Sequence, residues 1–126
     1  MLSVLIADDH DLFAASLAEL LSSEAGLAVV GRAADGAEAV ALASRLRPDV
    51  VVMDVTMPCC DGIDATREIT RTLAETRVVM LTGINDVDTS LRARAAGAAA
   101  YLIKGCPFEE LLSAIGAPSV TLAPAC

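Results

Sequence analysis

Five polar residues of this chain could bind a cation and an anionic group if the fold brings them together. Each follows a short apolar run: the pair Asp8 and Asp9, then Asp54, Thr82 and Lys104, which is the single lysine of the sequence. Three neighbouring carboxylates repel one another, and a hard divalent cation relieves that repulsion. Oxygen-only ligands favour Mg²⁺ over zinc or copper. The lysine can reach a phosphoryl oxygen or a carboxylate as a point charge, and the threonine adds a hydroxyl.

Short apolar runs predict the strands that must position these residues. Most of the runs are unbroken rather than alternating, as in strands buried on both faces of a parallel sheet. They are Leu2–Ala7, Leu27–Ala33, Val50–Met53, Val78–Leu81 and Ala98–Ile103. Ligands of open α/β sheets bind beyond the carboxyl ends of the strands, where the strand order reverses. In a sheet of order 2-1-3-4-5, the first and third strands are neighbours, so their three aspartates would meet.

Helical spacing between these runs predicts five helices. They run from Asp11 to about Glu24, from Asp35 to a stop before Pro48, from Asp61, from about Asp86 to Ala96, and from Pro107 to Ile115. The inward positions expected in the first three are Phe13, Leu17, Leu20 and Leu21, then Val40, Ala43 and Leu46, then Ile63, Ile69 and Leu73. The alternation predicts an α/β fold, a (βα)5 doubly wound parallel five-stranded sheet of the flavodoxin-like kind.

Composition limits the classes of function that the chain can have. It has 126 residues, 55% of them hydrophobic and 2% aromatic, with a net charge of −8. This favours one compact domain with an aliphatic core and argues against unaided binding to nucleic acid or an anionic membrane. The apolar runs are too short to span a bilayer. We expect a cytoplasmic protein with a domain over residues 1–116, and a tail or the start of an interdomain linker over 117–126.

These motifs, taken in order, resemble a two-component response-regulator receiver domain over residues 2–115. The matching segments are Leu-Ile-Ala-Asp-Asp-His at 5–10, Val-Met-Asp-Val-Thr-Met-Pro at 52–58, Asp-Gly at 61–62, Leu-Thr-Gly at 81–83 and Tyr-Leu-Ile-Lys at 101–104. The opening segment and the stretch after Asp61 look most like receivers that precede a LuxR/NarL-type helix-turn-helix domain. The resemblance implies the flavodoxin-like receiver fold.

The resemblance also implies a role for each site residue. Asp54 would be the nucleophile that takes a phosphoryl group from a histidine kinase or a small phosphodonor. Asp9, Asp54 and the backbone carbonyl of Thr56 would hold Mg²⁺, with Asp8 acting through water. Thr82 and Lys104 would bind the transferred phosphoryl oxygens. Phosphoryl transfer depends mostly on alignment and charge neutralisation, which such a set supplies.

A switch and a set of partners follow from the same resemblance. Tyr101 would turn inward when Thr82 moves, shifting the surface of the fourth helix, fifth strand and fifth helix. That surface, or one formed by the first and fifth helices, would support a homodimer. The domain would catalyse its own aspartyl phosphorylation and dephosphorylation as a signalling domain rather than an enzyme. The output would be transcription regulation through a DNA-binding domain outside this chain, with no direct contact between this domain and nucleic acid.

Several residues depart from the family pattern or have no role in it. Cys59 and Cys60 stand where relatives usually carry a glycine followed by an apolar residue, and Cys106 follows Lys104 closely. We expect reduced thiols, with thiol-linked modulation of phosphorylation as a hypothesis if Cys59 or Cys60 approaches Cys106. His10 is expected to be a loop residue at the start of the first helix, without a partner.

Three alternative functions compete with this interpretation. A receiver-like module that acts without phosphorylation would keep the same pocket. A phosphatase of the haloacid dehalogenase type needs a second aspartate two residues after Asp54, where this chain has Thr56. A flavodoxin-like or dinucleotide-binding module lacks support because there is no G-x-G-x-x-G segment and no P-loop.

Overall fold

The computed structural model describes residues 1–116, in which strands and helices alternate five times. In chain order they are β1 (Leu2–Ala7), α1 (Asp11–Ser22), β2 (Leu27–Ala33), α2 (Gly36–Leu46), β3 (Val50–Met53), α3 (Gly62–Thr72), β4 (Arg77–Thr82), α4 (Val87–Ala95), β5 (Ala100–Ile103) and α5 (Phe108–Ile115). The predicted (βα)5 pattern is therefore confirmed. The tail expected over residues 117–126 lies outside the described part.

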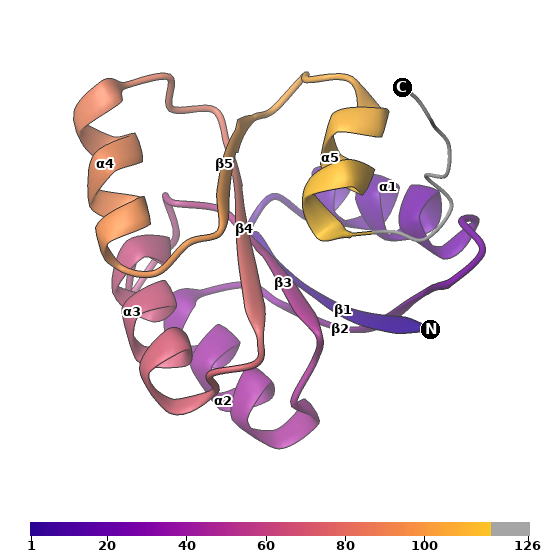
Figure 1. Ribbon diagram of the computed structural model, residues 1–126, viewed down its shortest axis with the longest axis horizontal. Coiled ribbons are helices and arrows are strands. Elements are labelled where there is room, and N and C mark those ends of the chain that lie inside the picture. The colour runs from indigo at the N-terminus through magenta and orange to yellow at the C-terminus, as the bar shows by residue number, and fades with distance from the viewer. Residues whose placement is uncertain (117–126) are drawn as a thin grey trace.

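All five strands are parallel, in the predicted order β2-β1-β3-β4-β5 (Figure 1). In the pairing of β1 with β3, Ala7 stands opposite Met53, so the residues that follow these two are neighbours at the end of the sheet. The pairing of β4 with β5 sets Thr82 opposite Ile103. The sheet register therefore aligns the four strand ends that the sequence marked with polar residues.

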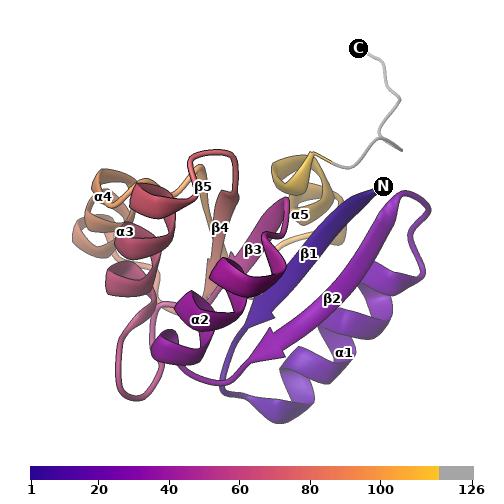
Figure 2. The same cartoon turned by 90° about the horizontal axis from the view of Figure 1, so that it is seen from below.

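Two helices cover one face of the sheet and three cover the other. Helices α1 and α5 lie on one side, and α2, α3 and α4 on the opposite side, as two perpendicular views show (Figures 1 and 2). Each layer has its own aliphatic core: Val4, Ile6 and Leu21 lie under α1 and α5, whereas Met53 and Ile69 lie on the other face. The aliphatic core inferred from the composition is thus split by the sheet.

Burial on both faces holds only for part of the sheet. Every residue of β3 is buried, as is almost all of β4, whereas β2 has exposed residues and no residue of β5 is fully buried. The two outer strands have a neighbour on one side only, which leaves their side chains nearer to solvent. Several bounds also differ from the prediction: the first helix ends at Ser22, β4 extends over Arg77–Thr82, and β5 begins at Ala100 rather than Ala98.

Two leucines expected to face inward are exposed instead. Leu20 is 51% exposed, because Ala14, Leu17 and Leu21 form the buried stripe of α1 and Leu20 lies at its margin. Leu46 is 38% exposed at the end of α2, beside the edge strand β2. Both leucines fit the helical spacing of apolar residues. The tertiary packing, however, buries a narrower stripe of each helix than that spacing predicts.

Aspartates begin three of the helices as the sequence indicated. The side chains of Asp35, Asp61 and Asp86 each accept a hydrogen bond from a backbone amide three residues later, which satisfies a donor left free at the helix start. Pro107, the predicted start of the fifth helix, is instead its N-terminal cap residue, and α5 begins one position later at Phe108. Within residues 1–116, every helix is too short or too polar to cross a bilayer.

Candidate functional site

Backbone hydrogen bonds continue the sheet beyond its strand ends and fix two of the site residues. The amide of Asp54 donates to the carbonyl of Ala7 at 2.9 Å. The amide of Lys104 donates to the carbonyl of Thr82 at 2.8 Å. Because these bonds extend the parallel ladders by one residue, the positions of Asp54 and Lys104 are set by the sheet rather than by a free loop.

The three predicted carboxylates do meet at the end of β1 and β3. One ligand atom from each of Asp8, Asp9, His10 and Asp54 lies within 4.8 Å of the others. Asp8 and Asp54 are buried, with 3% of each residue exposed, whereas Asp9 is exposed. Three carboxylates that converge on one point, open to solvent on one side, fit a hard divalent cation such as Mg²⁺. Asp8, Asp9 and Asp54 are thus the side chains that could hold it.

His10 has partners, contrary to the expectation from the sequence. It does stand at the start of α1, as its N-terminal cap residue. Its Nδ1, however, lies 3.1 Å from Asp8 Oδ1, 3.5 Å from Asp9 Oδ1 and 3.9 Å from Asp54 Oδ2. Its backbone amide also donates to Asp8 Oδ1 at 2.9 Å. In the sequence, these contacts are indicated by the position of His10 directly after Asp8 and Asp9. Helical spacing alone does not show which way its imidazole points.

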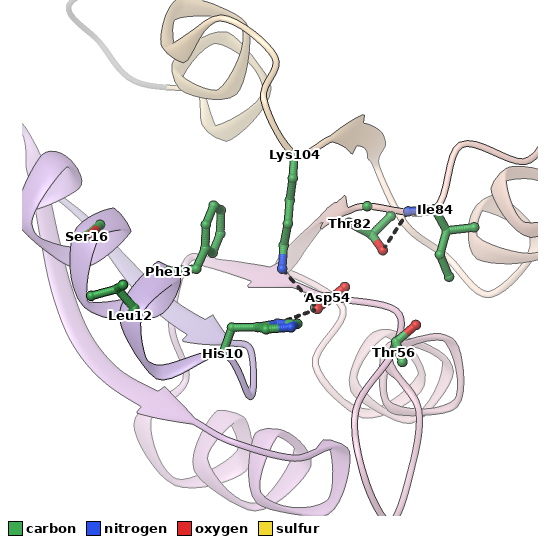
Figure 3. A pocket seen from close by; sticks show the side chains of 10 residues that line it. His10, Leu12, Phe13, Ser16, Asp54, Thr56, Thr82, Ile84 and Lys104 are labelled. Atoms are coloured by element: carbon green, nitrogen blue, oxygen red, sulfur yellow. Dashed lines mark hydrogen bonds and ion pairs between the residues drawn. The ribbon is translucent and has the colours of Figure 1, made fainter.

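Lys104 reaches into the carboxylate cluster from the end of β5. Its Nζ lies 2.9 Å from Asp8 Oδ2 and 3.2 Å from Asp54 Oδ2. Desolvation acts to lower the pKa of Lys104, but hydrogen bonds and charge attraction from Asp8 and Asp54 outweigh it and raise that pKa above its ordinary value. The ammonium is therefore charged at neutral pH and stands beside the proposed acceptor carboxylate, as Figure 3 shows.

Thr82 lies at the same cavity and is linked to Tyr101 through one residue. Only 1% of Thr82 is exposed, and its Oγ1 accepts a hydrogen bond from the amide of Ile84 at 3.4 Å. The hydroxyl of Tyr101 donates to the carbonyl of Ile84 at 2.7 Å. Burial, followed by the charges of Asp86 and Asp54, raises the pKa of Tyr101. Ile84 therefore connects Tyr101, the tyrosine predicted as a switch residue, to Thr82, the threonine with which it was paired.

A cavity of about 740 Å³ lies beside these groups, and part of its lining consists of residues that the sequence did not indicate. Asp54, Thr56, Thr82 and Lys104 line it, as do several apolar or small residues (Figure 3). The additional residues are Leu12, Phe13, Ser16, Gly83 and Ile84, together with His10. Thr56 and Ile84 both line this cavity. Phe13 was expected only as a core position of the first helix.

Glycine is required where α3 begins, close behind Asp54. A Cβ atom at Gly62 would lie 1.9 Å from the carbonyl oxygen of Asp54. The amide of Gly62 also donates to the carbonyl of Val55 at 2.7 Å. The Asp-Gly motif therefore has two structural roles: Asp61 caps the helix, and Gly62 lets its backbone pack against Asp54.

Cys60 and Cys106 lie on opposite faces of the sheet. Cys60 packs against the core under α2 and α3, whereas Cys106 packs against the core under α1 and α5, so the sheet separates the two thiols. Burial, followed by nearby acidic charges, raises the pKa of both thiols. The hypothesised approach of the Cys59–Cys60 pair to Cys106 is therefore wrong for Cys60. Cys59 itself is exposed and adopts a left-handed backbone with φ of 69°.

Comparisons with known proteins agree with the site. Residues 4–116 match the response regulator receiver domain family. The chain is 42% identical over 115 residues to the response regulator GacA of Pseudomonas aeruginosa, which covers 91% of this chain and 54% of GacA. It is 40% identical over 119 residues to the transcriptional regulatory protein LiaR of Bacillus subtilis, covering 94% of this chain and 56% of LiaR. The chain thus spans about half the length of these relatives.

A solved structure shares the fold. The two-component response regulator of the LuxR family from Aurantimonas sp. SI85-9A1 superposes with a TM-score of 0.87 and 35% sequence identity, over 92% of this chain and 83% of that one. The fold, the strand-end acids and the family match therefore agree with one another. This chain belongs to the response regulator receiver domain family, and its relatives include transcriptional regulators of the LuxR/NarL type.

Proposed function

We propose that this receiver accepts a phosphoryl group on Asp54 from a histidine kinase and passes the signal on as a change of its outer surface. The observation that carries the proposal is the position of Lys104, whose ammonium lies between Asp8 and Asp54 at 2.9 and 3.2 Å. A buried carboxylate that faces a cavity, with a cation beside it and the hydroxyl of Thr82 lining the same cavity, is arranged to receive an anionic group.

The transfer needs alignment and charge neutralisation more than it needs acid–base chemistry. A carboxylate oxygen of Asp54 forms a bond to phosphorus as the bond from phosphorus to the kinase imidazole breaks, and the electron pair stays with the imidazole. Lys104 offsets the negative charge that arrives, and Thr82 donates a hydrogen bond to a phosphoryl oxygen. Mg²⁺ held by Asp9, Asp54 and the carbonyl of Thr56, with Asp8 acting through water, would supply further positive charge at the phosphoryl oxygens.

We propose that the domain also catalyses hydrolysis of the aspartyl phosphate: a water oxygen bonds to phosphorus as the bond from phosphorus to the Asp54 oxygen breaks, which releases inorganic phosphate and restores the carboxylate. Thr56 and Ile84 line the cavity and would control how water reaches the phosphorus. The proposal implies a cytoplasmic location, a reducing compartment in which exposed thiols such as Cys59 stay free. Since the relatives are about twice as long as this chain, we propose that the output is transcription regulation by a DNA-binding domain outside it.

Intact mass after incubation with acetyl phosphate and Mg²⁺ tests the acceptor. The wild type should gain one phosphoryl group, the gain should require Mg²⁺, and Asp54→Ala should abolish it. Asp64→Ala is the matched control, because Asp64 is an exposed carboxylate paired with Arg67 on α3. No gain in the wild type would favour a module that acts without phosphorylation. A gain in Asp54→Ala would move the acceptor to another residue.

Two exposed apolar surfaces are candidates for a phosphorylation-dependent homodimer. Val87 and Leu91 on α4 are 76% and 61% exposed, and Leu12 and Leu20 on α1 are 82% and 51% exposed. The first surface belongs to the face of α4, β5 and α5, and the second to α1 and α5. Sedimentation with and without beryllofluoride, on Leu91→Asp and Leu20→Asp, separates them. The variant that stays monomeric identifies the interface, and a wild type that never dimerises contradicts both.

A further inference from the structure

Phe13 places an aromatic ring beside the only lysine of the chain. It lies in the first turn of α1, ninety-one positions before Lys104 in the sequence. The centroid of its ring is 4.4 Å from Lys104 Nζ. Figure 3 shows the ring beside the extended lysine side chain, and the ammonium at the end of that chain facing Asp54. The distance is within the range in which an ammonium is attracted to the electron-rich face of an aromatic ring.

The ring and the carboxylates hold the ammonium from different directions. Asp8 and Asp54 bind Nζ at 2.9 and 3.2 Å, and 19% of the lysine side chain is exposed. Lysine is a point charge on a flexible four-carbon stem, so its carboxylate partners alone leave the stem free to adopt several rotamers. A ring packed against the charged end restricts those rotamers, because moving the ammonium away from Asp54 also moves it off the ring.

We propose that Phe13 is a positioning residue for phosphoryl transfer, because its ring holds the Lys104 ammonium against Asp54. The inference rests on the proposed function of Asp54 as phosphoryl acceptor. In this role Phe13 touches neither the phosphoryl group nor the metal. It acts through Lys104 by keeping the cation where negative charge accumulates during transfer. A charge that is already in position needs no reorganisation during the reaction. The contact between Phe13 and Lys104 therefore acts on the rate of transfer.

The chain contains a matched control for this role. Phe13 and Phe108 are its two phenylalanines, and both line an apolar groove between α1 and α5. Phe13 also lines the acceptor cavity, which Phe108 does not. A loss of packing in the groove should therefore follow from replacing either residue. An effect on Lys104 should follow from replacing Phe13 alone.

The first experiment measures the rate of phosphorylation by acetyl phosphate at saturating Mg²⁺. Phe13→Leu, which keeps an apolar side chain but removes the ring, should lower the rate constant roughly tenfold, the size of a partly desolvated cation–π contact. Phe13→Tyr should restore most of the rate, and Phe108→Leu should stay near the wild type. Equal rates in Phe13→Leu and the wild type would overturn the proposal, as would a Phe13→Tyr variant as slow as Phe13→Leu.

The second experiment observes the lysine directly and needs no phosphorylation. Because Lys104 is the only lysine, selective labelling of lysine gives the signals of one side chain by NMR. A ring face shifts nearby protons upfield, so the ε-methylene of Lys104 should resonate upfield of free lysine. Phe13→Leu should abolish that shift, whereas Phe108→Leu should keep it. A wild type with no upfield shift overturns the positioning role.

The two experiments separate failure of this inference from failure of the proposed function. A wild type that gains no phosphoryl group overturns the function of Asp54, and the role of Phe13 in transfer falls with it. A wild type that is phosphorylated normally while Phe13→Leu matches its rate leaves the function of Asp54 intact and overturns the role of Phe13 alone.

Discussion

Tyr101 and Thr82 are joined through the backbone of a single residue between them in space. The tyrosine hydroxyl donates to the carbonyl of Ile84 at 2.7 Å, and the amide of Ile84 donates to the threonine hydroxyl at 3.4 Å. A movement of Thr82 toward a bound anion would therefore pull on the segment that holds Tyr101. The paired switch expected from the family resemblance stays a prediction, and this linkage is the path by which it would act.

Tyr101 should ionise above the ordinary tyrosine pKa of 10.0. Burial raises its pKa first, and the charges of Asp86 and Asp54 add to the effect. As the chain has one tyrosine and no tryptophan, the ultraviolet absorbance of phenolate reports this group alone. The sign follows from linkage: a raised folded pKa stabilises the protein fully below pH 10.0, and that stability is lost as pH rises through the folded value.

Asp86→Asn tests whether the charge of Asp86 contributes to the raised pKa of Tyr101. Asparagine keeps the capping oxygen at the start of α4 but removes the larger of the two charges that raise the pKa of Tyr101. The midpoint of the absorbance titration should move toward 10.0 in this variant. A midpoint at or below the ordinary value in the wild type would contradict the burial of the hydroxyl.

Gly62→Ala should destabilise the protein and slow phosphorylation together. The added Cβ would lie 1.9 Å from the carbonyl oxygen of Asp54, so the start of α3 and the acceptor residue must move apart. Overpacking of this kind costs roughly 1–3 kcal/mol, measurable by denaturant unfolding. Gly83→Ala is the control for the unfolding free energy, because a Cβ there meets nothing within 4 Å. Similar losses of unfolding free energy in both variants would show that steric contact with Asp54 is not the cause.

Cys59→Gly should stabilise the protein. Cys59 has a φ of 69°. The amide of Cys60 donates a hydrogen bond to the carbonyl of Pro58 at 2.8 Å, which closes a tight three-residue turn with Cys59 at its centre. A side chain in the left-handed region costs about 1–2 kcal/mol, while glycine gives back about 0.5–1 kcal/mol through its freer unfolded chain. The net gain in unfolding free energy should be up to about 1.5 kcal/mol.

Cys59→Ala distinguishes backbone strain from the thiol itself. Alanine removes the sulfur but keeps a Cβ, so it should leave the unfolding free energy close to that of the wild type. If alanine and glycine stabilise the protein equally, the strain argument is wrong and the thiol is the unfavourable group.

Mg²⁺ should raise the unfolding free energy of the wild type much more than that of Asp9→Asn. A cation at 100 times its dissociation constant stabilises the folded state by about 2.7 kcal/mol. Without metal, Asp9→Asn should be at least as stable as the wild type, since it removes one of three neighbouring carboxylates. Asp88→Asn, an exposed aspartate in the first turn of α4, serves as the control. Equal Mg²⁺ responses in all three proteins would contradict the carboxylate site.

The sequence allowed the positions of the site residues to be predicted because they lie where parallel strands end. Asp8, Asp54, Thr82 and Lys104 each follow from a strand boundary and a strand order, both of which depend on backbone rules. The ring of Phe13 and the contacts of His10 depend on which way a side chain points across a helix turn, which periodicity does not determine. Cys60 shows the same limit, since its loop position did not reveal which face of the sheet it packs against.

The groups that face the acceptor cavity and the apolar residues that face solvent lie on different parts of the fold. Asp54 and Lys104 are fixed by sheet hydrogen bonds, whereas Leu20, Val87 and Leu91 lie on outer helix faces. Substitutions at these exposed positions can therefore alter recognition without displacing the reacting atoms. Duplicated copies of such a gene can therefore acquire separate signalling partners through changes at the exposed helix positions alone. The exposed helix positions then keep parallel pathways apart, while the reacting groups held by the sheet stay the same in each copy.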